Sequence, residues 1–270
     1  MTNATLLKEQ GNRHFQTGDY ARAEALYSQA LIADPTNPVL YTNRAMARLK
    51  LDQWDNVIVD CDQCLTIAPE NMKAHYYLSQ AHLALHAYDD AVKHALIAHK
   101  LCVKAGDKSL AAITGQVLKC KKERWDDLEK RRSRETSDLE TQIIEMLQRE
   151  MDQALKDEVD DVTKNEIEEE WEQKLNRMRQ VFESARAKES KRRKVPDWAI
   201  DDITFCVMVD PVITKTGKSY ERASIEEHLR RQPTDPLTRE PLYISELRPN
   251  LDLKQACEEF LEENGWAADW

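Results

Sequence analysis

Glycine, phenylalanine and long apolar runs are all scarce in this chain of 270 residues. It contains only 6 glycines and 4 phenylalanines, whereas Asp, Glu, Lys and Arg together make up 33% of the residues. A glycine-rich phosphate loop is hard to build from so few glycines, and high charge with low glycine favours a helix-rich soluble protein. No apolar stretch approaches the roughly 18 residues that a membrane-spanning helix needs, so we expect no membrane partner.

Cysteine is sparse as well. Six cysteines in 270 residues are too few for a disulfide scaffold and favour a reducing compartment. The first residues, Met1 to Ala4, lack the basic-then-apolar layout of a secretory signal. We therefore expect a cytoplasmic protein. The basic run at 191–194 keeps a nuclear address open as an alternative, although such a run is more often a solvated helix end.

The net charge of −10 is unevenly distributed. Residues 196–270 contain 8 basic and 16 acidic side chains, so this segment alone contributes −8 (8 minus 16). An acidic segment repels nucleic acid and can attract a basic protein surface. We therefore expect protein partners and no nucleic acid.

A period of 34 residues runs through the first third of the chain. Small residues recur at Gly11, Ala45 and Ser79, and turn residues cluster at 17–19 and 34–35. A period of this length is the signature of stacked helix–turn–helix units, here over 4–37, 38–71 and 72–105. Such units cannot bury their apolar faces alone, so they stack into a curved array with a concave groove. This groove predicts a peptide-binding module rather than a catalytic cleft.

The spacing of Cys61 and Cys64 resembles that of half a zinc or redox site. They lie in the second helix of the second repeat, at two of its small packing positions, and no second Cys/His pair of matching spacing accompanies them. We interpret them as packing residues and expect no metal and no cofactor.

The composition changes again after the repeats. A helix over 109–122 is expected to cap the last repeat, and from 119 to 190 there is no proline or glycine. Apolar residues follow a helical period on both sides of an acidic break at 157–161, which predicts two long amphipathic helices folded as a hairpin. A narrow apolar stripe on a charged helix usually seeks a partner helix. We expect homodimerisation; the alternative is a hairpin packed only on itself and on the repeats.

The stripe consists of Trp125, Leu128, Leu139, Ile143, Leu147, Met151 and Leu155, followed by Ile167, Trp171, Leu175, Met178 and Phe182.

Prolines and Gly217 divide residues 196–270 into short segments. We expect strands at 207–209 and 211–213 and a final helix over 253–263. A further helix is expected over 224–231, with Ser224 as its N-cap and Glu227 completing a capping box.

The loop spacing of this last segment resembles that of a RING domain. A RING domain holds two zinc ions with about eight Cys and His ligands, but only Cys206, His228 and Cys257 are present here. Two zinc sites are therefore impossible, and we expect His228 to be structural.

The order of motifs instead resembles the U-box, the zinc-free relative of RING that is held by hydrogen bonds and salt bridges where the metals would sit. The motifs are Ile203-Thr204-Phe205, Met208-Val209-Asp210-Pro211-Val212, Gly217-Lys218-Ser219-Tyr220-Glu221-Arg222, Ile225-Glu226-Glu227-His228-Leu229, Asp235-Pro236-Leu237-Thr238-Arg239-Glu240-Pro241-Leu242 and Pro249-Asn250-Leu251.

Three tetratricopeptide repeats, a charged hairpin and a U-box together resemble the CHIP-type family of chaperone-associated ubiquitin ligases. The repeats carry Lys8-Glu9-Gln10-Gly11-Asn12-Arg13, Tyr41-Thr42-Asn43-Arg44-Ala45 and Lys73-Ala74-His75, and the U-box ends in Glu263-Asn264-Gly265-Trp266. The resemblance implies a mainly α fold with a small α+β domain. Its parts are a repeat domain with a capping helix (1–122), a dimerising helical hairpin (123–194) and a U-box (195–270).

Lys8, Asn12, Asn43 and Lys73 fall on the first helices of the three repeats. Two ammonium groups and two amides in one groove suit a terminal carboxylate and an acidic side chain. The resemblance implies a clamp for the Glu-Glu-Val-Asp tail of heat-shock chaperones of the Hsp-seventy and Hsp-ninety classes. It further implies that Tyr77 packs on an apolar side chain of this peptide, and it offers Asp107 as the acidic residue before the seventh helix.

The resemblance also implies ubiquitin ligase activity without a covalent intermediate, because such domains only orient a charged ubiquitin-conjugating enzyme. Ile203, Phe205 and Pro236 are expected to dock the enzyme, and Arg239 to hydrogen-bond both enzyme and ubiquitin. Core packing of Ile203 and Phe205 and a structural salt bridge of Arg239 remain the alternatives. The substrates would be misfolded, chaperone-bound clients destined for proteasomal degradation.

Two other functions stay open. One is a non-enzymatic chaperone adaptor whose U-box only docks or dimerises. The other is a spliceosomal or repair scaffold, which the clamp residues disfavour.

Overall fold

The computed structural model describes residues 3–157, 161–189 and 194–270. They form two compact units, Met1–Trp125 with Pro196–Trp270, and Asp126–Val195. The repeat helices are α1 (Asn3–Gln16), α2 (Tyr20–Ala33), α3 (Pro38–Leu49), α4 (Trp54–Ile67), α5 (Met72–Ala84) and α6 (Tyr88–Ala105). Two long helices follow, α7 (Leu110–Asp157) and α8 (Asp161–Glu189).

The C-terminal part contains η1 (Asp197–Ala199), β1 (Pro211–Ile213), β2 (Ser219–Glu221), α9 (Arg222–Arg231), η2 (Ile244–Glu246), β3 (Arg248–Pro249), α10 (Leu251–Glu263) and η3 (Gly265–Asp269). None of the described helices is both long enough and apolar enough to cross a membrane.

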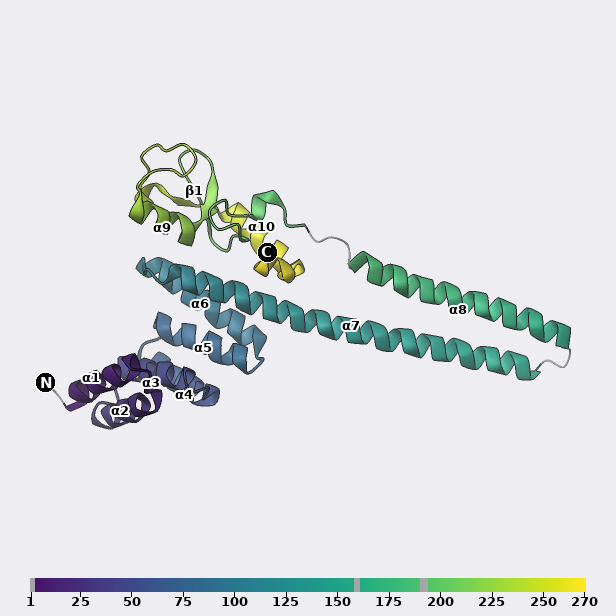
Figure 1. Ribbon diagram of the computed structural model, residues 1–270, viewed down its shortest axis with the longest axis horizontal. Coiled ribbons are helices and arrows are strands. Elements are labelled where there is room, and N and C mark those ends of the chain that lie inside the picture. Colours follow the sequence, from purple (N-terminus) through teal and green to yellow (C-terminus); the bar gives the residue numbers. More distant parts are fainter. Residues whose placement is uncertain (1–2, 158–160, 190–193) are drawn as a thin grey trace. The chain divides into compact units, whose positions relative to one another are not determined.

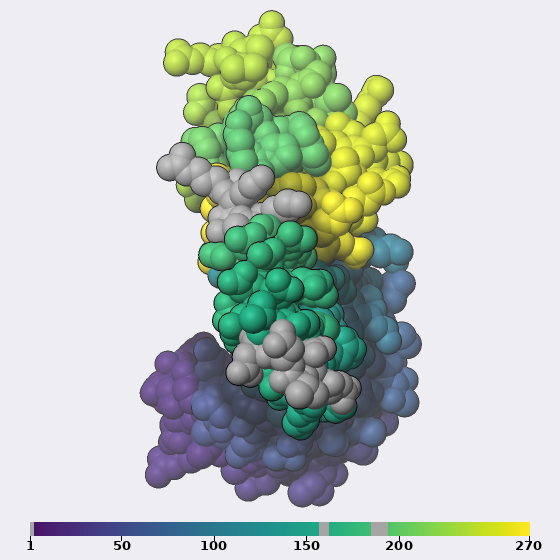
Figure 2. Space-filling model, turned by 90° about the vertical axis from the view of Figure 1, so that its right-hand side faces the viewer, coloured from purple at the N-terminus to yellow at the C-terminus, as the bar shows by residue number. Residues whose placement is uncertain are grey.

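Six helices in three antiparallel pairs confirm the 34-residue period (Figure 1). In the space-filling view the repeats form one continuous band, coloured purple to blue (Figure 2). The polar residue before each turn explains where several helices begin. Asp19, Asn37 and Asn71 each accept a hydrogen bond through the side chain from a backbone amide of the first turn of α2, α3 and α5. Such caps satisfy amides that have no partner inside the helix.

The small residue in the first helix of each pair allows a close approach to the second helix. A Cβ atom on Gly11 would lie 2.6 Å from Cε1 of Tyr27, whose side chain is fully buried. A larger residue at position 11 would therefore push α1 away from α2. Ala45 and Ser79 occupy the equivalent positions and are also fully buried.

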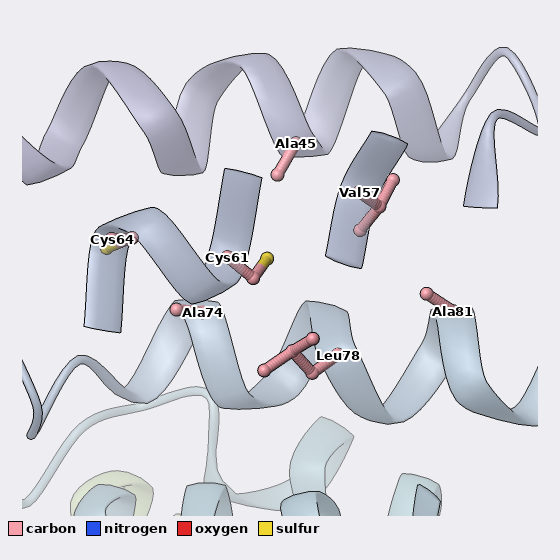
Figure 3. Packing of buried hydrophobic residues seen from close by; sticks show 7 residues of the cluster. All are labelled: Ala45, Val57, Cys61, Cys64, Ala74, Leu78 and Ala81. Carbon is pink, nitrogen blue, oxygen red and sulfur yellow. The ribbon is translucent and has the colours of Figure 1, made fainter. Parts of the chain in front are cut away.

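The core between the second and third repeats consists mainly of small side chains. Figure 3 shows these side chains between α3, α4 and α5: Ala45, Val57, Cys61, Cys64, Ala74, Leu78 and Ala81. Both cysteines are free and fully buried. Burial raises the pKa of Cys64 to about 11, so it remains a thiol, and its position is that of the packing residue the sequence predicted.

A network of buried charges ties α2, α3 and α4 together. The fully buried Asp60 accepts hydrogen bonds from Arg44 Nη2 at 2.6 Å and from Arg48 Nη1 at 2.9 Å. Arg48 also donates to Glu24 at 2.7 Å, and Arg44 donates to Ser28 at 3.1 Å. Two arginines on one helix therefore fix both neighbouring helices, because each guanidinium spreads several donors in a rigid plane.

The helix that caps the repeats and the first arm of the hairpin form one continuous helix, α7. The predicted boundary at 122/123 therefore falls inside a helix, and the two compact units divide at Trp125/Asp126. Nothing in residues 119–126 stops a helix, since neither proline nor glycine occurs there.

In the second unit, α8 runs back in the direction opposite to α7 (Figure 1). The middle of the predicted stripe, including Ile143, Leu147 and Trp171, is half-buried, and Leu175 is buried. Leu128 and Leu139 stay exposed. Of the predicted acidic break, residues 158–160 lie outside the described part of the chain, as do residues 191–193 of the basic run.

The small sheet of the C-terminal domain has the strand order β2-β1-β3, with both pairs antiparallel. The predicted strand at 207–209 is wrong: only Val207 pairs, in an isolated bridge with Ile200. The amides of Val209 and Asp210 instead donate to the buried Glu221 carboxylate at 2.7 and 2.9 Å. A side chain thus takes the place of a neighbouring strand.

The predicted capping box at Ser224 is also wrong. The helix α9 begins two residues earlier, at Arg222, and its N-cap Glu221 makes no side-chain cap bond. Ser224 lies inside the first turn, where its hydroxyl donates to the Glu221 carbonyl at 2.9 Å. The final helix was predicted correctly, although it starts at Leu251, with Asn250 as its cap.

Three histidines cluster between α5 and α6 of the third repeat. His75 Nδ1 and His94 Nδ1 share a hydrogen bond of 2.9 Å, and the ring of His82 stacks on that of His94 with centroids 5.6 Å apart. Burial, together with the neighbouring His75 and His82, lowers the pKa of His94 to about 4. His94 is therefore neutral at pH 7.

This cluster makes stability depend on pH. Between about pH 6.5, the ordinary histidine pKa, and about pH 4 the unfolded chain binds a proton at position 94 that the folded chain lacks. The unfolding free energy should therefore fall as the pH drops through this range. Because His94 is only half buried, we discount the effect to about 1–2 kcal/mol. His94→Gln should reduce the pH dependence of the unfolding free energy, measured by denaturant titration at pH 7 and pH 5.

Other histidines contribute to the same pH dependence. His75 and His99, whose pKa values burial also lowers, should retain part of it. An identical pH dependence in His94→Gln and the unmodified chain would contradict the assignment.

Candidate functional site

Two asparagines meet on the face of the repeats formed by the first helices. Asn12 on α1 accepts hydrogen bonds through Oδ1 from the Tyr27 hydroxyl at 2.8 Å and from Asn43 Nδ2, on α3, at 3.3 Å. Both bonds end on the same oxygen, so the Asn12 amide nitrogen is left as a donor. The tyrosine stays a neutral donor, because burial raises its pKa to about 12.

Two lysines flank this pair. Lys8 lies one turn before Asn12 on α1, and Lys73 lies at the start of α5. Among residues 3–157, 161–189 and 194–270, no carboxylate forms an ion pair with either lysine. Lys73 is exposed and Lys8 is half-buried. Two uncompensated ammonium groups beside amide donors form a site for an anionic group, and a carboxylate is the usual partner of such a set.

The repeats also enclose a cavity of about 780 Å³ between α3, α5 and the start of α7. Its lining is mainly apolar and aromatic and includes Met46, Leu49, Trp54, Tyr77 and Leu83. Met46 lies three residues after Asn43 on α3, and Tyr77 four residues after Lys73 on α5, so the cavity continues the face that carries the polar groups. A peptide held at its carboxylate by the polar groups could extend an apolar side chain into this cavity.

Asp107 has a structural contact of its own. Its Oδ1 accepts a hydrogen bond of 2.8 Å from the Ser109 amide, just before α7 begins. This bond, with a smaller contribution from the charge of Lys73, holds the pKa of Asp107 below its ordinary value. The carboxylate thus lies within electrostatic reach of Lys73, and it also holds the turn that precedes α7. Its role in peptide binding stays a prediction.

The predicted docking residues of the C-terminal domain differ in exposure. Phe205 is 70% exposed, an unusual state for a phenylalanine. Pro236 is half-buried and Arg239 is exposed. Ile203 is half-buried and packs against the core around Val212. It therefore contributes to the core, the alternative considered for it from the sequence, and part of its surface remains accessible.

The turn between β1 and β2 contacts both loops that carry these residues. Lys218 Nζ lies 2.5 Å from Asp202 Oδ2, beside the first loop. Lys215 Nζ donates to the Pro241 carbonyl at 2.7 Å, and the Thr216 hydroxyl donates to Asp235 at 2.9 Å, both on the second loop. One five-residue turn therefore holds the two loops beside each other.

Sequence reasoning missed several residues of these surfaces. Leu237 is 68% exposed and directly follows Pro236, so the second loop offers more apolar surface than predicted. An apolar residue beside a proline in an acidic segment was the available signal. Met46 and Trp54 could not be assigned to the groove, because each also fits the small-and-large pattern of a repeat core.

No group of three or more His, Cys, Asp or Glu side chains in the described ranges is arranged to hold a metal ion. His228 has a structural partner, since its Nε2 lies 2.9 Å from the Thr234 carbonyl oxygen. This contact fixes the end of α9 against the second loop.

Comparison with known families defines the class of protein. The U-box domain family matches residues 195–266, and the tetratricopeptide repeat family matches residues 4–37. A solenoid of three such repeats and a C-terminal U-box are thus present in one chain.

One curated relative extends over almost the whole sequence. The E3 ubiquitin-protein ligase CHIP of Arabidopsis thaliana is 33% identical over 269 residues, covering 98% of this chain and 95% of the relative. The chain belongs to the CHIP family of U-box E3 ubiquitin-protein ligases. It is therefore a ubiquitin transferase, and the purely non-enzymatic alternatives are set aside.

Other similarities are confined to the repeats. Tetratricopeptide repeat protein 12 of Mus musculus is 42% identical over 88 residues, which cover 33% of this chain and 12% of that protein. Among solved structures, the first tetratricopeptide domain of Spaghetti, bound to the HSP90 peptide SRMEEVD, is 32% identical with a TM-score of 0.37. It covers 41% of this chain and 89% of that one.

The site makes a direct prediction for binding. Lys8→Ala should weaken binding of a peptide ending in Glu-Glu-Val-Asp by at least about tenfold, since a charge-assisted hydrogen bond is worth roughly 1.5–3 kcal/mol. Isothermal titration calorimetry measures the change. Lys93→Ala, at an exposed position of the outer helix α6, is the matched control and should bind like the unmodified chain. Equal affinity of Lys8→Ala and the control would contradict the clamp.

Proposed function

We propose that this ligase selects its substrates through chaperones: its repeats hold the acidic C-terminal tail of a heat-shock chaperone while its U-box directs ubiquitin to the bound misfolded client. The proposal is supported by the contact between Asn12 and Asn43, by Lys8 one turn before Asn12 and Lys73 at the start of α5, and by the lack of an ion pair between either lysine and a carboxylate of the described residues.

The chemistry of the groove favours a chain terminus over an internal acidic segment. Two ammonium groups and two side-chain amides can hold two carboxylates at once, and the last residue of an acidic tail supplies both in one position. The neighbouring apolar cavity of about 780 Å³ suits an aliphatic side chain a few residues upstream. A tail that combines terminal Asp, preceding Glu residues and an aliphatic residue meets all three requirements.

The U-box supplies docking and orientation. Exposed Phe205 and Leu237 offer apolar surface, and a conjugating enzyme can bury it on binding. Arg239, exposed beside them, is in reach to hydrogen-bond the enzyme and its ubiquitin. Orientation alone accelerates attack on the thioester, because the acceptor no longer searches for the reactive geometry. We place this activity in the cytoplasm, where the chaperones and their clients meet.

The test is ubiquitylation in vitro with activating enzyme, a panel of conjugating enzymes and a chaperone with or without its last four residues. Chains should form on a client bound to the intact chaperone and be lost with the truncated one. Phe205→Ala should abolish transfer yet leave peptide binding intact, since the two surfaces lie in different domains. Equal modification with both chaperones would refute the tail as the selecting element, and full activity of Phe205→Ala would refute the docking surface.

We further propose that the helical hairpin pairs two copies of the chain. Beyond the half-buried stripe, the arms of the hairpin keep large apolar side chains accessible: Leu139 is 51% exposed, Met146 54% and Val181 61%. The second compact unit has few buried residues of its own, among them Leu175. A second hairpin laid against these positions would bury them, as helices with narrow apolar seams do.

Replacing Leu139 and Met146 together by lysine should convert the protein from a dimer to a monomer, because two charges would enter the seam. Sedimentation velocity measures the mass directly. Asp152→Lys, which adds a lysine at an exposed position on another face of the same helix, is the control and should remain dimeric. A monomeric unmodified chain, or a dimeric double variant, would contradict the pairing.

A further inference from the structure

Two loops of the U-box share one hydrogen-bond pattern. In the first, the amide of Phe205 donates to the Asp201 carbonyl at 2.8 Å, and the amide of Asp201 donates to the Cys206 carbonyl at 2.9 Å. In the second, the amide of Arg239 donates to the Asp235 carbonyl at 2.9 Å, and the amide of Asp235 donates to the Glu240 carbonyl at 2.8 Å. Each loop is thus a six-residue turn that begins with an aspartate.

The fifth residue of each loop adopts the same unusual backbone conformation. Phe205 has φ 59° and Arg239 has φ 61°. Residues other than glycine rarely occupy this left-handed region, and the strain persists only where the surroundings hold it. The two residues in this conformation are those expected to contact the conjugating enzyme and its ubiquitin.

The aspartates hold these loops from inside. Both side chains are fully buried, although Phe205 and Leu237 at the loop tips are 70% and 68% exposed. Asp201 Oδ2 accepts hydrogen bonds from the Thr204 amide at 2.9 Å and from its hydroxyl at 2.8 Å. Asp235 Oδ1 accepts hydrogen bonds from the Leu237 amide at 2.8 Å and from the next amide at 3.2 Å.

We infer that Asp201 and Asp235 are paired positioning residues for ubiquitin transfer: each organises one loop so that Phe205 or Arg239 meets the charged conjugating enzyme in its left-handed conformation. The inference rests on the proposed roles of Phe205 and Arg239. Neither aspartate is exposed, so neither contacts the enzyme itself, and each acts only through its loop.

The remaining oxygen of each aspartate distinguishes the two. Asp201 Oδ1 accepts a hydrogen bond of 3.0 Å from the Glu221 amide, so both of its oxygens receive backbone N–H groups. Asparagine has only one oxygen, so in either orientation of its side-chain amide the NH₂ group would face a buried backbone N–H donor. Asp201→Asn would therefore leave two donors facing each other and should impair ubiquitin transfer as much as Asp201→Ala.

Asp235 can tolerate asparagine, because its second partner is a hydroxyl. Thr216 Oγ1 donates to Asp235 Oδ2 at 2.9 Å and lies 2.7 Å from Thr214 Oγ1, which in turn donates to the Lys218 carbonyl at 3.1 Å. With asparagine, Thr216 can accept from the new NH₂ group and donate to Thr214, while the Asp235 Oδ1 position still receives the amide of Leu237. Every buried group keeps a partner.

The experiment measures discharge of ubiquitin from a charged conjugating enzyme to free lysine at varied enzyme concentration, with the full-length chain. Asp201→Asn should raise KM at least about tenfold with kcat retained, because it disturbs the docking loop. Asp235→Ala should lower kcat at least about tenfold and also raise KM, since its loop carries Pro236 as well. Asp235→Asn should stay within about threefold of the unmodified chain.

Two matched controls make the same chemical change at exposed carboxyl side chains of the U-box. Glu240→Gln and Asp252→Asn, both at exposed positions, should retain normal kinetics. Binding of the acidic peptide to the repeats, measured in parallel, reports whether each variant chain remains folded outside the U-box.

A double variant tests whether the Thr216 hydroxyl can switch from donor to acceptor toward residue 235. This test stays informative even if Asp235→Ala fails to fold. Thr216→Val removes the hydroxyl and keeps a similar shape, so Asp235 Oδ2 loses its donor, and in the double variant the asparagine NH₂ group has no acceptor. Thr216→Val alone and Thr216→Val with Asp235→Asn should therefore each lower kcat at least about tenfold relative to the unmodified chain, whereas Asp235→Asn alone should not. Normal kinetics of Thr216→Val or of the double variant would overturn the inference, as would normal kinetics of Asp201→Asn or Asp235→Ala.

Failure of the proposed function has a different outcome. If Phe205→Ala and Arg239→Ala themselves leave KM and kcat unchanged, the roles assigned to these two side chains are wrong. If they impair transfer while Asp201→Asn does not, the roles stand and the positioning by the aspartates is refuted.

Discussion

Fully buried carboxylates, with each oxygen engaged by donors, are the constraint on which both functional ends of this protein depend. Asp60 is held by two arginines in the repeats, and Asp201 and Asp235 by backbone amides and hydroxyls in the U-box. A buried carboxylate that loses a partner is costly, whereas one that keeps all its partners fixes every group that points at it. Each of these three aspartates therefore fixes the geometry of the segments that supply its donors.

The groups proposed to bind partners lie next to these aspartates in the chain. Asn43 directly precedes Arg44, which holds Asp60, and Pro236 directly follows Asp235. The aspartates are buried and each of their oxygens is hydrogen-bonded, and the neighbouring side chains are accessible. This division is chemically useful because the U-box forms no covalent intermediate and contributes mainly orientation to ubiquitin transfer. A small displacement of a docking loop would remove most of this contribution of orientation to the rate, even though the domain remained folded.

Regular elements could be predicted from the sequence, and long-range polar contacts could not. The 34-residue period predicted six helices, because the recurrence of small residues at Gly11, Ala45 and Ser79 is a local pattern. The strand at 207–209 was wrong, since the amides there are satisfied by the distant Glu221 carboxylate, which no local pattern reveals. The boundary at 122/123 lies inside α7, because a change of composition is no obstacle to a helix where neither proline nor glycine occurs, as in residues 119–126. The left-handed Phe205 and Arg239 were equally invisible, because non-glycine residues carry no signal for that conformation.

The continuous helix α7 supplies an apolar face to two different parts of the chain. Its first turns cover the last repeat, where Ile113, Val117 and Cys120 are buried, and its later turns carry Leu139 and Met146 of the proposed dimer seam. Each use requires only a stretch of apolar side chains on one face of a helix, and neither requires a break between the two stretches. One uninterrupted helix can therefore serve both the repeats and the hairpin, and a change of composition along it marks a change of packing partner rather than the end of the element.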